Sequence, residues 1–439
     1  MAQLIYVDSQ LIERHISALA KIGCLGPNEG FTRAAWSDEE STAMNYIAAE
    51  GKAAGFQPWW DAIGNLFLTR AGSIEQILQI GSHLDTVPGG GNYDGAAGIA
   101  AGLEALKAVS SQQINAGLEL VVWRGEESAT FGAPYKGSKG AFGEPFVDSK
   151  GRRDILANEF CGVSLEKAMR TQGDDPQYLM ANTPTLTPTH IENITGHIEL
   201  HIEQGPVLEN SGKDIGIVTA IRGNTRHWID VEGEFNHSGT TPMKDRKDAN
   251  TAIAHMIAEA DKMAWNAEHY GNDITQTVGI LNAERSRNET MGVYHNALTK
   301  VPGCGYFSLE IRSANWNFLQ SYTGEVMQRI EQIAKEKNVK VNIIPISAEA
   351  PVTAFSSELQ AIAERKADEL GYASMYMQSG AGHDCAVVAR QRLKSPIPTL
   401  LIFIPCRDGK SHCKEEYASP DAITKGANVL ANTVYELAR

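Results

Sequence analysis

The spacing of hydrophobic and polar residues predicts alternating helices and strands in the first half of the chain. Residues 9–22 carry apolar side chains at helical intervals with charged residues between them, and residues 96–109 predict a helix rich in Ala and Gly. Residues 66–68 and 77–80 are predicted to be neighbouring strands. Residues 118–123 form a nearly continuous apolar strand, the kind that is buried on both faces of a sheet. This alternation predicts an α/β layer architecture.

The order of predicted elements changes near residue 216. From there the pattern predicts β-α-β-β-α-β, beginning with a long strand or hairpin at residues 217–235, which is a compact α+β unit. A helix at residues 356–370 and a strand at 399–404 then resume the first architecture. Because 439 residues exceed one ordinary core, we expect two domains. Their predicted bounds are 1–215 with 349–439, and 216–348 for an inserted domain.

The composition and net charge of the chain disfavour several classes of function. The chain has 39 Lys and Arg against 53 Asp and Glu, a net charge of −14, which disfavours binding to nucleic acid or to an anionic membrane. The N-terminus lacks the features of a signal peptide and no apolar run has the length of a membrane span, so a cytoplasmic location is expected. The six cysteines include no C-x-x-C pair, which argues against a cysteine zinc site.

A glycine-rich stretch at residues 79–98 brings polar side chains to the end of a predicted strand. It contains His83, Asp85 and Asp94. Imidazole and carboxylate groups are ligands for zinc-like divalent ions, and the glycines allow the loop to wrap around an ion. The alternative is a strand followed by a tight turn with polar decoration, and this stretch alone does not separate the two.

Other polar residues also stand at predicted strand ends. Glu126 and Glu127 follow the strand 118–123, so one could bind metal while the other acts as a general base; the alternative is a solvated acidic turn. His201 lies near the end of an alternating strand, and His412 lies in a glycine-bearing loop. His197 shares the face of His201, so alternation does not choose between them.

Together these side chains form an oxygen-and-nitrogen ligand set large enough for two divalent ions. The set comprises His83, Asp94, Glu127, His201 and His412.

Three further candidates lie outside that set. His237 is in the run F-N-H-S-G-T-T-P-M, for which a capping turn is the alternative. Arg312 closes a predicted strand and could bind a substrate carboxylate through its planar fork, although a surface salt bridge is the common fate of such an arginine. His383 lies in the loop S-G-A-G-H-D, which could equally be a turn before a helix.

These motifs resemble those of the dinuclear metal amidohydrolases, typified by N-carbamoyl-L-amino acid hydrolases and allantoate amidohydrolases. That family is related to aminoacylases and carboxypeptidase-like metallopeptidases. The matching pieces appear in family order from residue 81 to residue 412. They are G-S-H-L-D-T-V-P-G-G-G-N-Y-D-G, G-E-E-S, L-H-I-E-Q-G-P-V-L-E, H-S-G-T-T-P-M, S-G-A-G-H-D and D-G-K-S-H.

The resemblance implies a metallopeptidase-like catalytic domain, with a central mixed sheet flanked by helices, and an inserted lid or dimerisation domain. It implies that Asp94 bridges two metals, with His83 and Glu127 divided between them. His201, rather than His197, and His412 would complete the shells. Zinc, manganese, cobalt and nickel all accept this ligand set.

The resemblance also implies roles around the metals. Asp85 would orient His83, Glu126 would be the general base, and His237 would reach the active site of the partner subunit in a homodimer. The implied substrate is a small molecule with a carboxylate that Arg312 would hold. The candidate substrate-binding residues are Arg312, Gln204, Thr299 and His383.

The chain departs from the family pattern in the inserted domain. Thr299 stands where the family usually has Asn, which puts the substrate in doubt more than the reaction. Residues 280–301 look longer than in typical members and contain Arg285, Arg287, Asn288 and His295. We hypothesise that this segment selects the substrate.

The resulting prediction is a metal-dependent hydrolase of the carbamoyl or ureido C–N bond in an N-carbamoyl-L-amino acid or an allantoate-like substrate, releasing ammonia and carbon dioxide. An aminoacylase or dipeptidase-like activity on N-acyl amino acids is the alternative among enzymes. A noncatalytic metal-binding or interaction protein is the alternative of another class. The presence of both Glu126 and Glu127 disfavours it, because a binding scaffold needs no base beside a ligand.

Overall fold

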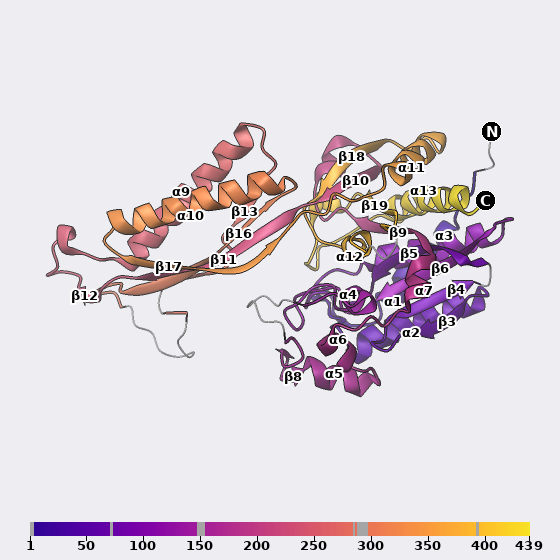
Figure 1. The fold of residues 1–439 in the computed structure, drawn as a ribbon, viewed down its shortest axis with the longest axis horizontal. Helices are drawn as coiled ribbons and strands as arrows, with labels where there is room; N and C mark the ends of the chain where they lie inside the picture. Colours follow the sequence, from indigo (N-terminus) through magenta and orange to yellow (C-terminus); the bar gives the residue numbers. More distant parts are fainter. Residues whose placement is uncertain (1–3, 71–72, 147–153, 284–285, 288–296, 392–394) are drawn as a thin grey trace. The chain divides into compact units, whose positions relative to one another are not determined.

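The computed structural model describes residues 4–70, 73–146, 154–283, 286–287, 297–391 and 395–439. The chain divides into two compact units (Figure 1). The main unit comprises Met1–Ala220 and Thr353–Arg439, and the inserted unit comprises Ile221–Val352. None of the described helices has the length and apolar character that would cross a membrane.

The main unit is built on a mixed sheet of eight strands. Their order is β18 (Ser374–Ser379), β10 (Ile215–Ile221), β19 (Thr399–Ile404), β9 (Ile194–Ile202), β5 (Ser73–His83), β6 (Ala116–Trp123), β4 (Leu66–Arg70) and β3 (Gln57–Trp60). The four strands β19, β9, β5 and β6 are parallel to one another. Strands β10, β4 and β3 pair antiparallel at the sides. The predicted central mixed sheet is confirmed.

Helices flank this sheet. The main-unit helices are α1 (Ser9–Leu19), α2 (Asp38–Ala53), α3 (Ala96–Ser110), α4 (Lys136–Phe142), α5 (Leu165–Gln172), α6 (Gln177–Ala181), α7 (Pro188–Asn193), α8 (Val207–Ser211), α11 (Ser357–Glu369), α12 (Cys385–Ala389) and α13 (Pro420–Ala438). Two short hairpins, β1 (Cys24–Gly26) with β2 (Gly30–Phe31) and β7 (Glu159–Phe160) with β8 (Val163–Ser164), complete the unit.

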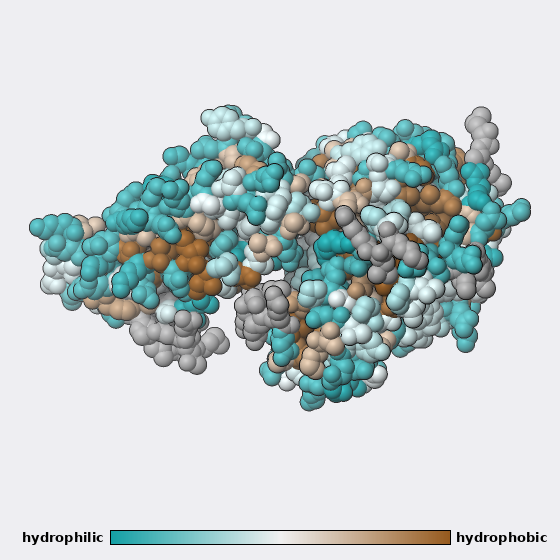
Figure 2. Space-filling model, in the orientation of Figure 1, coloured by the Kyte–Doolittle hydropathy of each residue, from teal (hydrophilic) through white to brown (hydrophobic). Residues whose placement is uncertain are grey.

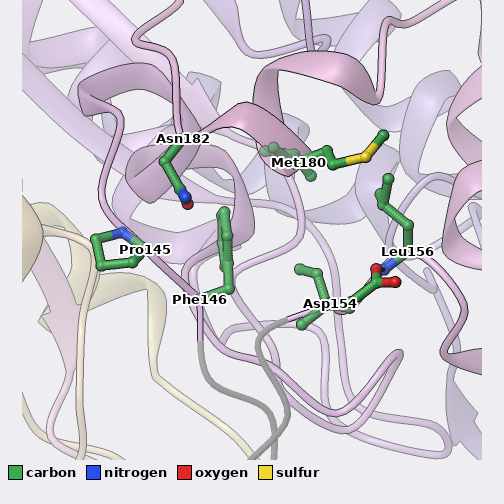
Figure 3. A pocket seen from close by; sticks show the side chains of 8 residues that line it. Pro145, Phe146, Asp154, Leu156, Met180 and Asn182 are labelled. Carbon is green, nitrogen blue, oxygen red and sulfur yellow. Dashed lines mark hydrogen bonds between the residues drawn. The ribbon is translucent and has the colours of Figure 1, made fainter.

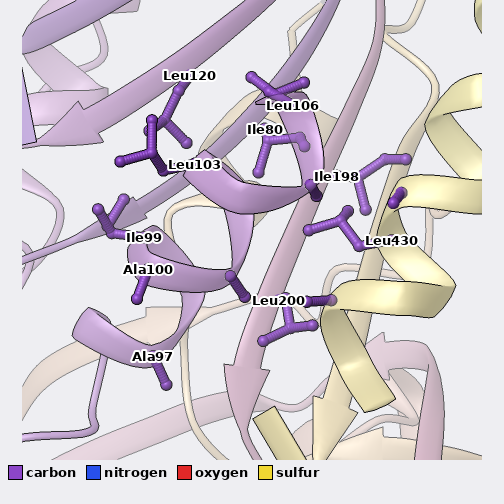
Figure 4. Packing of buried hydrophobic residues seen from close by; sticks show 14 of the residues in the cluster. Ile80, Ala97, Ile99, Ala100, Leu103, Leu106, Leu120, Ile198, Leu200 and Leu430 are labelled. Carbon is purple, nitrogen blue, oxygen red and sulfur yellow. The ribbon is translucent and has the colours of Figure 1, made fainter. Parts of the chain in front are cut away.

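Helix α3 packs tightly on the sheet because Gly98 and Gly102 face the strands. Figure 4 shows Leu103 and Leu106 of α3 gathered with Ile80 and Leu120 of the strands. At Gly98 a Cβ atom would collide with the carbonyl oxygen of Leu200, so only glycine permits this approach. The close contact fixes the loop between β5 and α3, which carries Asp85 and Asp94.

The inserted unit is an antiparallel sheet covered on one face by two helices. Its elements are β11 (Gly223–Glu232), β12 (Asn236–His237), η1 (Met243–Asp245), α9 (Ala249–His269), β13 (Thr275–Thr277), β14 (Leu281–Asn282), β15 (Lys300–Val301), β16 (Cys304–Ser313), α10 (Trp316–Glu336) and β17 (Lys340–Glu349). The sheet order is β13-β16-β11-β17, with β14 also on β16. Alternate residues Phe307, Leu309 and Ile311 of β16 are buried with side chains of α9 and α10.

Two expectations about strands were wrong. The predicted strand or hairpin at residues 217–235 is divided: β10 pairs with β19 in the main sheet, whereas β11 lies in the sheet of the inserted unit. The hydrophobic pattern of this segment does not indicate where the chain leaves one sheet and enters the other. The predicted neighbours β4 and β5 are separated by β6, which pairs with both. A hydrophobic run specifies a strand but not its partner.

One face of the main sheet carries a row of polar side chains across β4, β6, β5 and β9, of which those on β6, β5 and β9 are buried. Thr69 donates to Glu119 Oε2 at 3.0 Å, and Gln79 Nε2 donates to Glu119 Oε1 at 2.8 Å. Gln79 therefore presents Oε1 to His197, whose Nδ1 lies 2.8 Å away and must carry the proton. Burial lowers the pKa of His197 to about 3, so this histidine is neutral.

The buried position of His197 predicts a pH dependence of stability. An unfolded histidine has a pKa of about 6.5, so below that pH the unfolded state binds one more proton than the folded state. The stabilisation is complete above about pH 6.5 and falls by up to about 1.4 kcal/mol per pH unit as the pH drops toward 3. In His197→Gln, the loss of unfolding free energy between pH 7.5 and 5.5 should be smaller by about 1.4 kcal/mol. Urea unfolding of the metal-free proteins measures it, and identical pH profiles would contradict it.

Candidate metal centre

The predicted ligand residues gather at the carboxyl ends of the parallel strands. His83 ends β5, and Glu126 and Glu127 follow β6. His201 precedes the last residue of β9, and His412 follows β19 after the short turn η2 (Arg407–Gly409). Because these strands run parallel and adjacent, their ends meet at one edge of the sheet, where open α/β sheets bind ligands.

Asp94 lies at the centre of this group, and its two carboxylate oxygens face different partners. Oδ1 is 3.0 Å from His201 Nε2 and 3.3 Å from His83 Nε2. Oδ2 is 3.3 Å from His412 Nε2, which is also 3.2 Å from Glu127 Oε1. The result is two ligand groups, His83 with Asp94 and His201, and Asp94 with Glu127 and His412, that share Asp94.

The imidazoles are oriented so that Nε2 can donate its lone pair. His83 Nδ1 lies 3.1 Å from the backbone oxygen of Asp85. His201 Nδ1 donates to the backbone oxygen of Ile202 at 2.9 Å, which leaves its Nε2 facing Asp94 Oδ1 at 3.0 Å. A metal-bound histidine commonly donates its other ring N–H in this way. The donors present therefore fit divalent metal ions.

The charge of Asp94 is stabilised in the interior by the histidines. Burial acts to raise the pKa of Asp94, but the charge of His201 and the hydrogen bonds of His201, His412 and His83 outweigh it and hold that pKa well below its ordinary value. Hydrogen bonds to Asp94 and Glu127 raise the pKa of His412 to about 11. Asp94 is thus ionised at neutral pH, as a carboxylate shared by two cations must be.

Asp85 ties the loop after β5 to the loop after β6. Its Oδ1 accepts the backbone N–H of Glu126 and its Oδ2 accepts that of Glu127, each at 3.0 Å. Its Oδ1 also lies 3.3 Å from His83 Nδ1. The same buried carboxylate therefore sets the direction of His83 and of the Glu126–Glu127 pair.

Glu126 differs from its neighbour Glu127. It belongs to neither ligand group formed by the described residues. Burial and the charges of Glu127, Asp384 and Asp85 raise the pKa of Glu126 well above its ordinary value, against the opposing effect of His83. A carboxylate with a raised pKa accepts and keeps a proton more readily, which suits a general base.

A family model now places this arrangement among known proteins. The model for Peptidase family M20/M25/M40 matches residues 79–436. The chain belongs to this family. It is 33% identical to an allantoate amidohydrolase of Bacillus subtilis (strain 168), over 97% of each chain. It is 32% identical to an N-carbamoyl-L-amino acid amidohydrolase of Geobacillus stearothermophilus, over 97% of this chain and 98% of the relative.

Solved structures agree with this assignment. The crystal structure of a hydantoinase/carbamoylase family amidase from Burkholderia ambifaria has a TM-score of 0.81 and 30% sequence identity, covering 100% of this chain and 99% of that chain. The predicted resemblance is confirmed, and so is the prediction of a metal-dependent hydrolase that acts on carbon–nitrogen bonds. Family membership and the histidine and carboxylate groups both support metal binding.

Two of the candidate substrate-binding residues, Gln204 and His383, lie beside the ligand set. Gln204 Nε2 donates to Asp94 Oδ2 at 2.7 Å, and its buried Oε1 has no partner among the described residues. His383 is buried with its ring edge against His201, at 4.5 Å between centroids, and its Nε2 is 3.2 Å from Ser379 Oγ. Burial and the charge of His201 lower the pKa of His383 well below its ordinary value, so it is neutral.

A further group of donors, formed by Glu199, His201 and His383, shares His201 with the first ligand group. Only one ring nitrogen of His201 is not already bonded to a backbone carbonyl. The competing histidine His197 is in none of the groups found among the described residues, and its Nδ1 is hydrogen-bonded to Gln79.

The remaining candidates lie in the inserted unit. His237 is exposed and its Nδ1 accepts the N–H of Gly239 at 3.1 Å. Thr299 is its neighbour, since the Thr299 carbonyl accepts the N–H of Ser238 at 2.9 Å. Arg312 is partly exposed and donates to Glu310 Oε1 at 3.0 Å.

The long segment at residues 280–301 is described only in part. Arg285, Asn288 and His295 lie outside the described residues. Arg287 donates to Asp230, at 2.9 Å to Oδ1 and 3.2 Å to Oδ2. The substrate-selecting role of this segment stays a prediction.

Sequence reasoning missed two buried charges at the centre. The ammonium of Lys136 donates to the backbone oxygens of Glu127 at 2.9 Å and Ala133 at 2.8 Å, which fixes the loop after the carboxylate pair. Glu416 contacts the loops of Asp94 and His412. The spacing of Glu416, four residues after His412, could have identified it from the sequence. No local sequence pattern predicts that Lys136 is buried.

The main unit also has a hollow elsewhere. It has a volume of about 310 Å³ (Figure 3) and is lined by Pro145, Phe146, Asp154, Ile155, Leu156, Leu179, Met180 and Asn182. None of the predicted site residues lines it. It is therefore separate from the ligand set.

The contacts of Asp85 predict a loss of stability in Asp85→Asn. Asparagine replaces one carboxylate oxygen by an amide that cannot accept, so the N–H of Glu126 or Glu127 loses its partner. An unpaired buried donor costs about 1–3 kcal/mol, and the unfolding free energy of the metal-free protein in urea should fall by that amount. Asp175→Asn is the control, because exposed Asp175 accepts the Gln177 N–H through one oxygen that asparagine retains. Equal, small losses in both variants would contradict the role of Asp85.

Proposed function

We propose that this protein hydrolyses the carbamoyl or ureido C–N bond of an N-carbamoyl-L-amino acid or an allantoate-like carboxylate, using two divalent ions. One observation carries the proposal: Asp94 turns one oxygen to His83 and His201 and the other to His412. A carboxylate shared in this way suits a pair of cations, which act as a clamp in hydrolytic sites.

The proposed ligands follow from these contacts. His83, Asp94 and His201 would hold one ion, and Asp94, Glu127 and His412 the other. When bound, such ions supply Lewis acidity that polarises a carbonyl and acidifies water. Zinc, manganese, cobalt and nickel are all compatible with this mixture of imidazole and carboxylate donors.

Glu126 is the proposed proton carrier. Its raised pKa favours taking a proton from the attacking water, and the same carboxyl then gives the proton to the departing nitrogen. Asp85 holds the backbone N–H of Glu126 and so keeps the carboxyl group in a fixed position. Gln204 Oε1, which has no partner in the described part of the chain, is an acceptor for a substrate N–H, and His383 offers a neutral imidazole.

The proposed substrate carboxylate binds Arg312, with Thr299 as a neighbouring polar contact. The relatives named for allantoate and for N-carbamoyl-L-amino acids support a carbamoyl or ureido group next to a carboxylate. Arg312 already donates to the carboxylate of Glu310. A substrate carboxylate would thus meet an arginine that already binds a carboxylate through one N–H group.

His237 is proposed to act in the active site of a partner subunit. Because its Nδ1 accepts from Gly239, the neutral ring carries its proton on Nε2 and can donate to a developing oxyanion. The edge strand β17 supports a homodimer through this unit: it pairs only with β11 among the described strands and has half-buried Ile344 and Ile346. Figure 2 shows hydrophobic residues gathered on the inserted unit.

The decisive assay is release of ammonia. Protein loaded separately with zinc, manganese, cobalt or nickel is offered N-carbamoyl-L-amino acids, N-carbamoyl-β-alanine, allantoate and ureidoglycolate. At least one should yield ammonia, and Glu126→Gln should lower kcat by about 10²–10⁴-fold with metal content unchanged. N-acetyl amino acids are the matched comparison, because their hydrolysis releases no ammonia. Turnover of these alone, or no turnover at full metal occupancy, would contradict the proposal.

The role of His237 is tested by mixing inactive subunits. Glu126→Gln and His237→Ala are each expected to be nearly inactive and folded. In a random mixture half of the dimers contain both variants, and each of these has one site with both native groups, so about one quarter of wild-type activity should return. If His237 serves its own subunit, the mixture stays inactive. Analytical ultracentrifugation confirms the dimer in each sample.

A further inference from the structure

We infer that Glu416 is a positioning residue that holds the loop of Asp94 and the loop of His412 at the separation required by the second metal position. This inference rests on the proposed function, since it concerns the same centre. It goes beyond that proposal by assigning a role to a residue that is in neither ligand group.

The carboxylate of Glu416 accepts from four donors on two loops. Its Oε1 accepts the backbone N–H groups of Tyr93 and Asp94, both at 2.9 Å. Its Oε2 accepts the backbone N–H of His412 at 3.2 Å and lies 2.9 Å from the hydroxyl of Ser411, whose one proton is shared with Asp94 Oδ2 at 3.0 Å. The two loops are more than 300 residues apart in the sequence, and Glu416 joins them through the backbone N–H groups of both.

The side chain has little freedom to move. Glu416 is 4% exposed. A Cβ atom added at Gly91 would collide with both the carboxylate and the Cβ atom of Glu416. The loop before Asp94 therefore closes around the Glu416 side chain. The carboxylate oxygens are therefore fixed by backbone on one side and by the Ser411–His412 loop on the other.

His412 needs such a contact more than the other proposed ligands do. His83 and His201 belong to the strands β5 and β9 and are nearly fully buried. His412 lies in a loop at a φ of 58°, and 49% of its side chain is exposed. The backbone N–H of His412 bonded to Glu416 is thus a direct constraint on where its imidazole meets Asp94 and Glu127.

Cobalt binding tests this inference without substrate. Wild-type protein, Glu416→Gln and the control Glu104→Gln are freed of metal and titrated with Co²⁺ by calorimetry and visible absorption. Glutamine cannot accept at both ends, so affinity at one of the two sites should fall about 10–100-fold and the cobalt spectrum should change. The other site should stay within about threefold of wild type, because two of its three ligands, His83 and His201, are held by strands β5 and β9.

The control separates a local effect from general destabilisation. Glu104 is 3% exposed and accepts from His15 at 2.8 Å and Lys107 at 2.7 Å, and it contacts none of the ligand residues. Glu104→Gln should therefore keep both cobalt affinities whatever it does to thermal stability. Affinities in Glu416→Gln within about twofold of wild type at both sites would overturn the inference.

Gly91→Ala provides a second route if Glu416→Gln does not fold. The φ of Gly91 lies outside the left-handed region, and the three nearest atoms to an added Cβ all belong to Glu416. The methyl group would displace the carboxylate and leave its chemistry intact. The same selective loss of cobalt affinity is expected, and a folded Gly91→Ala with both affinities unchanged would overturn the inference.

The two proposals fail in different ways. A wild-type protein that binds two cobalt ions but releases no ammonia refutes the proposed function and leaves the role of Glu416 in place. An active enzyme whose Glu416→Gln variant binds both ions normally refutes only the role of Glu416. A wild-type protein that binds fewer than two ions refutes both.

Discussion

The main unit depends on one buried carboxylate, Asp94, surrounded by imidazoles. A lone ionised carboxylate in the interior carries a large desolvation cost, and burial alone would raise its pKa. His83, His201 and His412 reverse that effect by contact with both of its oxygens. Such contacts require strands far apart in the sequence to end at the same edge, which the parallel order of β19, β9, β5 and β6 provides.

Further buried charges support this arrangement through the backbone. Asp85 accepts the N–H groups of Glu126 and Glu127, and Glu416 accepts those of Tyr93 and Asp94 on one side and of His412 on the other. Each carboxylate thereby joins two loops that contain proposed ligands. Oriented backbone dipoles stabilise the buried anions at the same time, so the positions of the loops and the ionisation of the centre depend on each other.

The sequence was most informative where chemistry and local pattern coincide. Apolar runs predicted the strands. The histidines and carboxylates at the ends of those strands predicted the set of ligand residues that meets at Asp94. It was least informative where the answer depends on contacts between distant segments. Alternation could not separate His197 from His201, because both lie on one face of β9 and only tertiary contacts place His201 beside Asp94 and His197 beside Gln79. The division of β10 from β11 and the burial of Lys136 are likewise set by tertiary partners.

The proposed division of labour has a physical consequence for substrate choice. The ligand set lies wholly in the main unit, whereas Arg312, Thr299 and His237 lie in the inserted unit. In the proposed function, binding of a substrate carboxylate to Arg312 replaces its contact with Glu310, which also accepts from Arg226. Since the guanidinium exchanges one carboxylate for another, little new desolvation is required, and discrimination must come from the rest of the substrate. The ligands of the proposed metal ions would then belong to one unit alone, whereas the proposed substrate contacts belong to both, so that changes in the inserted unit would alter substrate choice without disturbing Asp94.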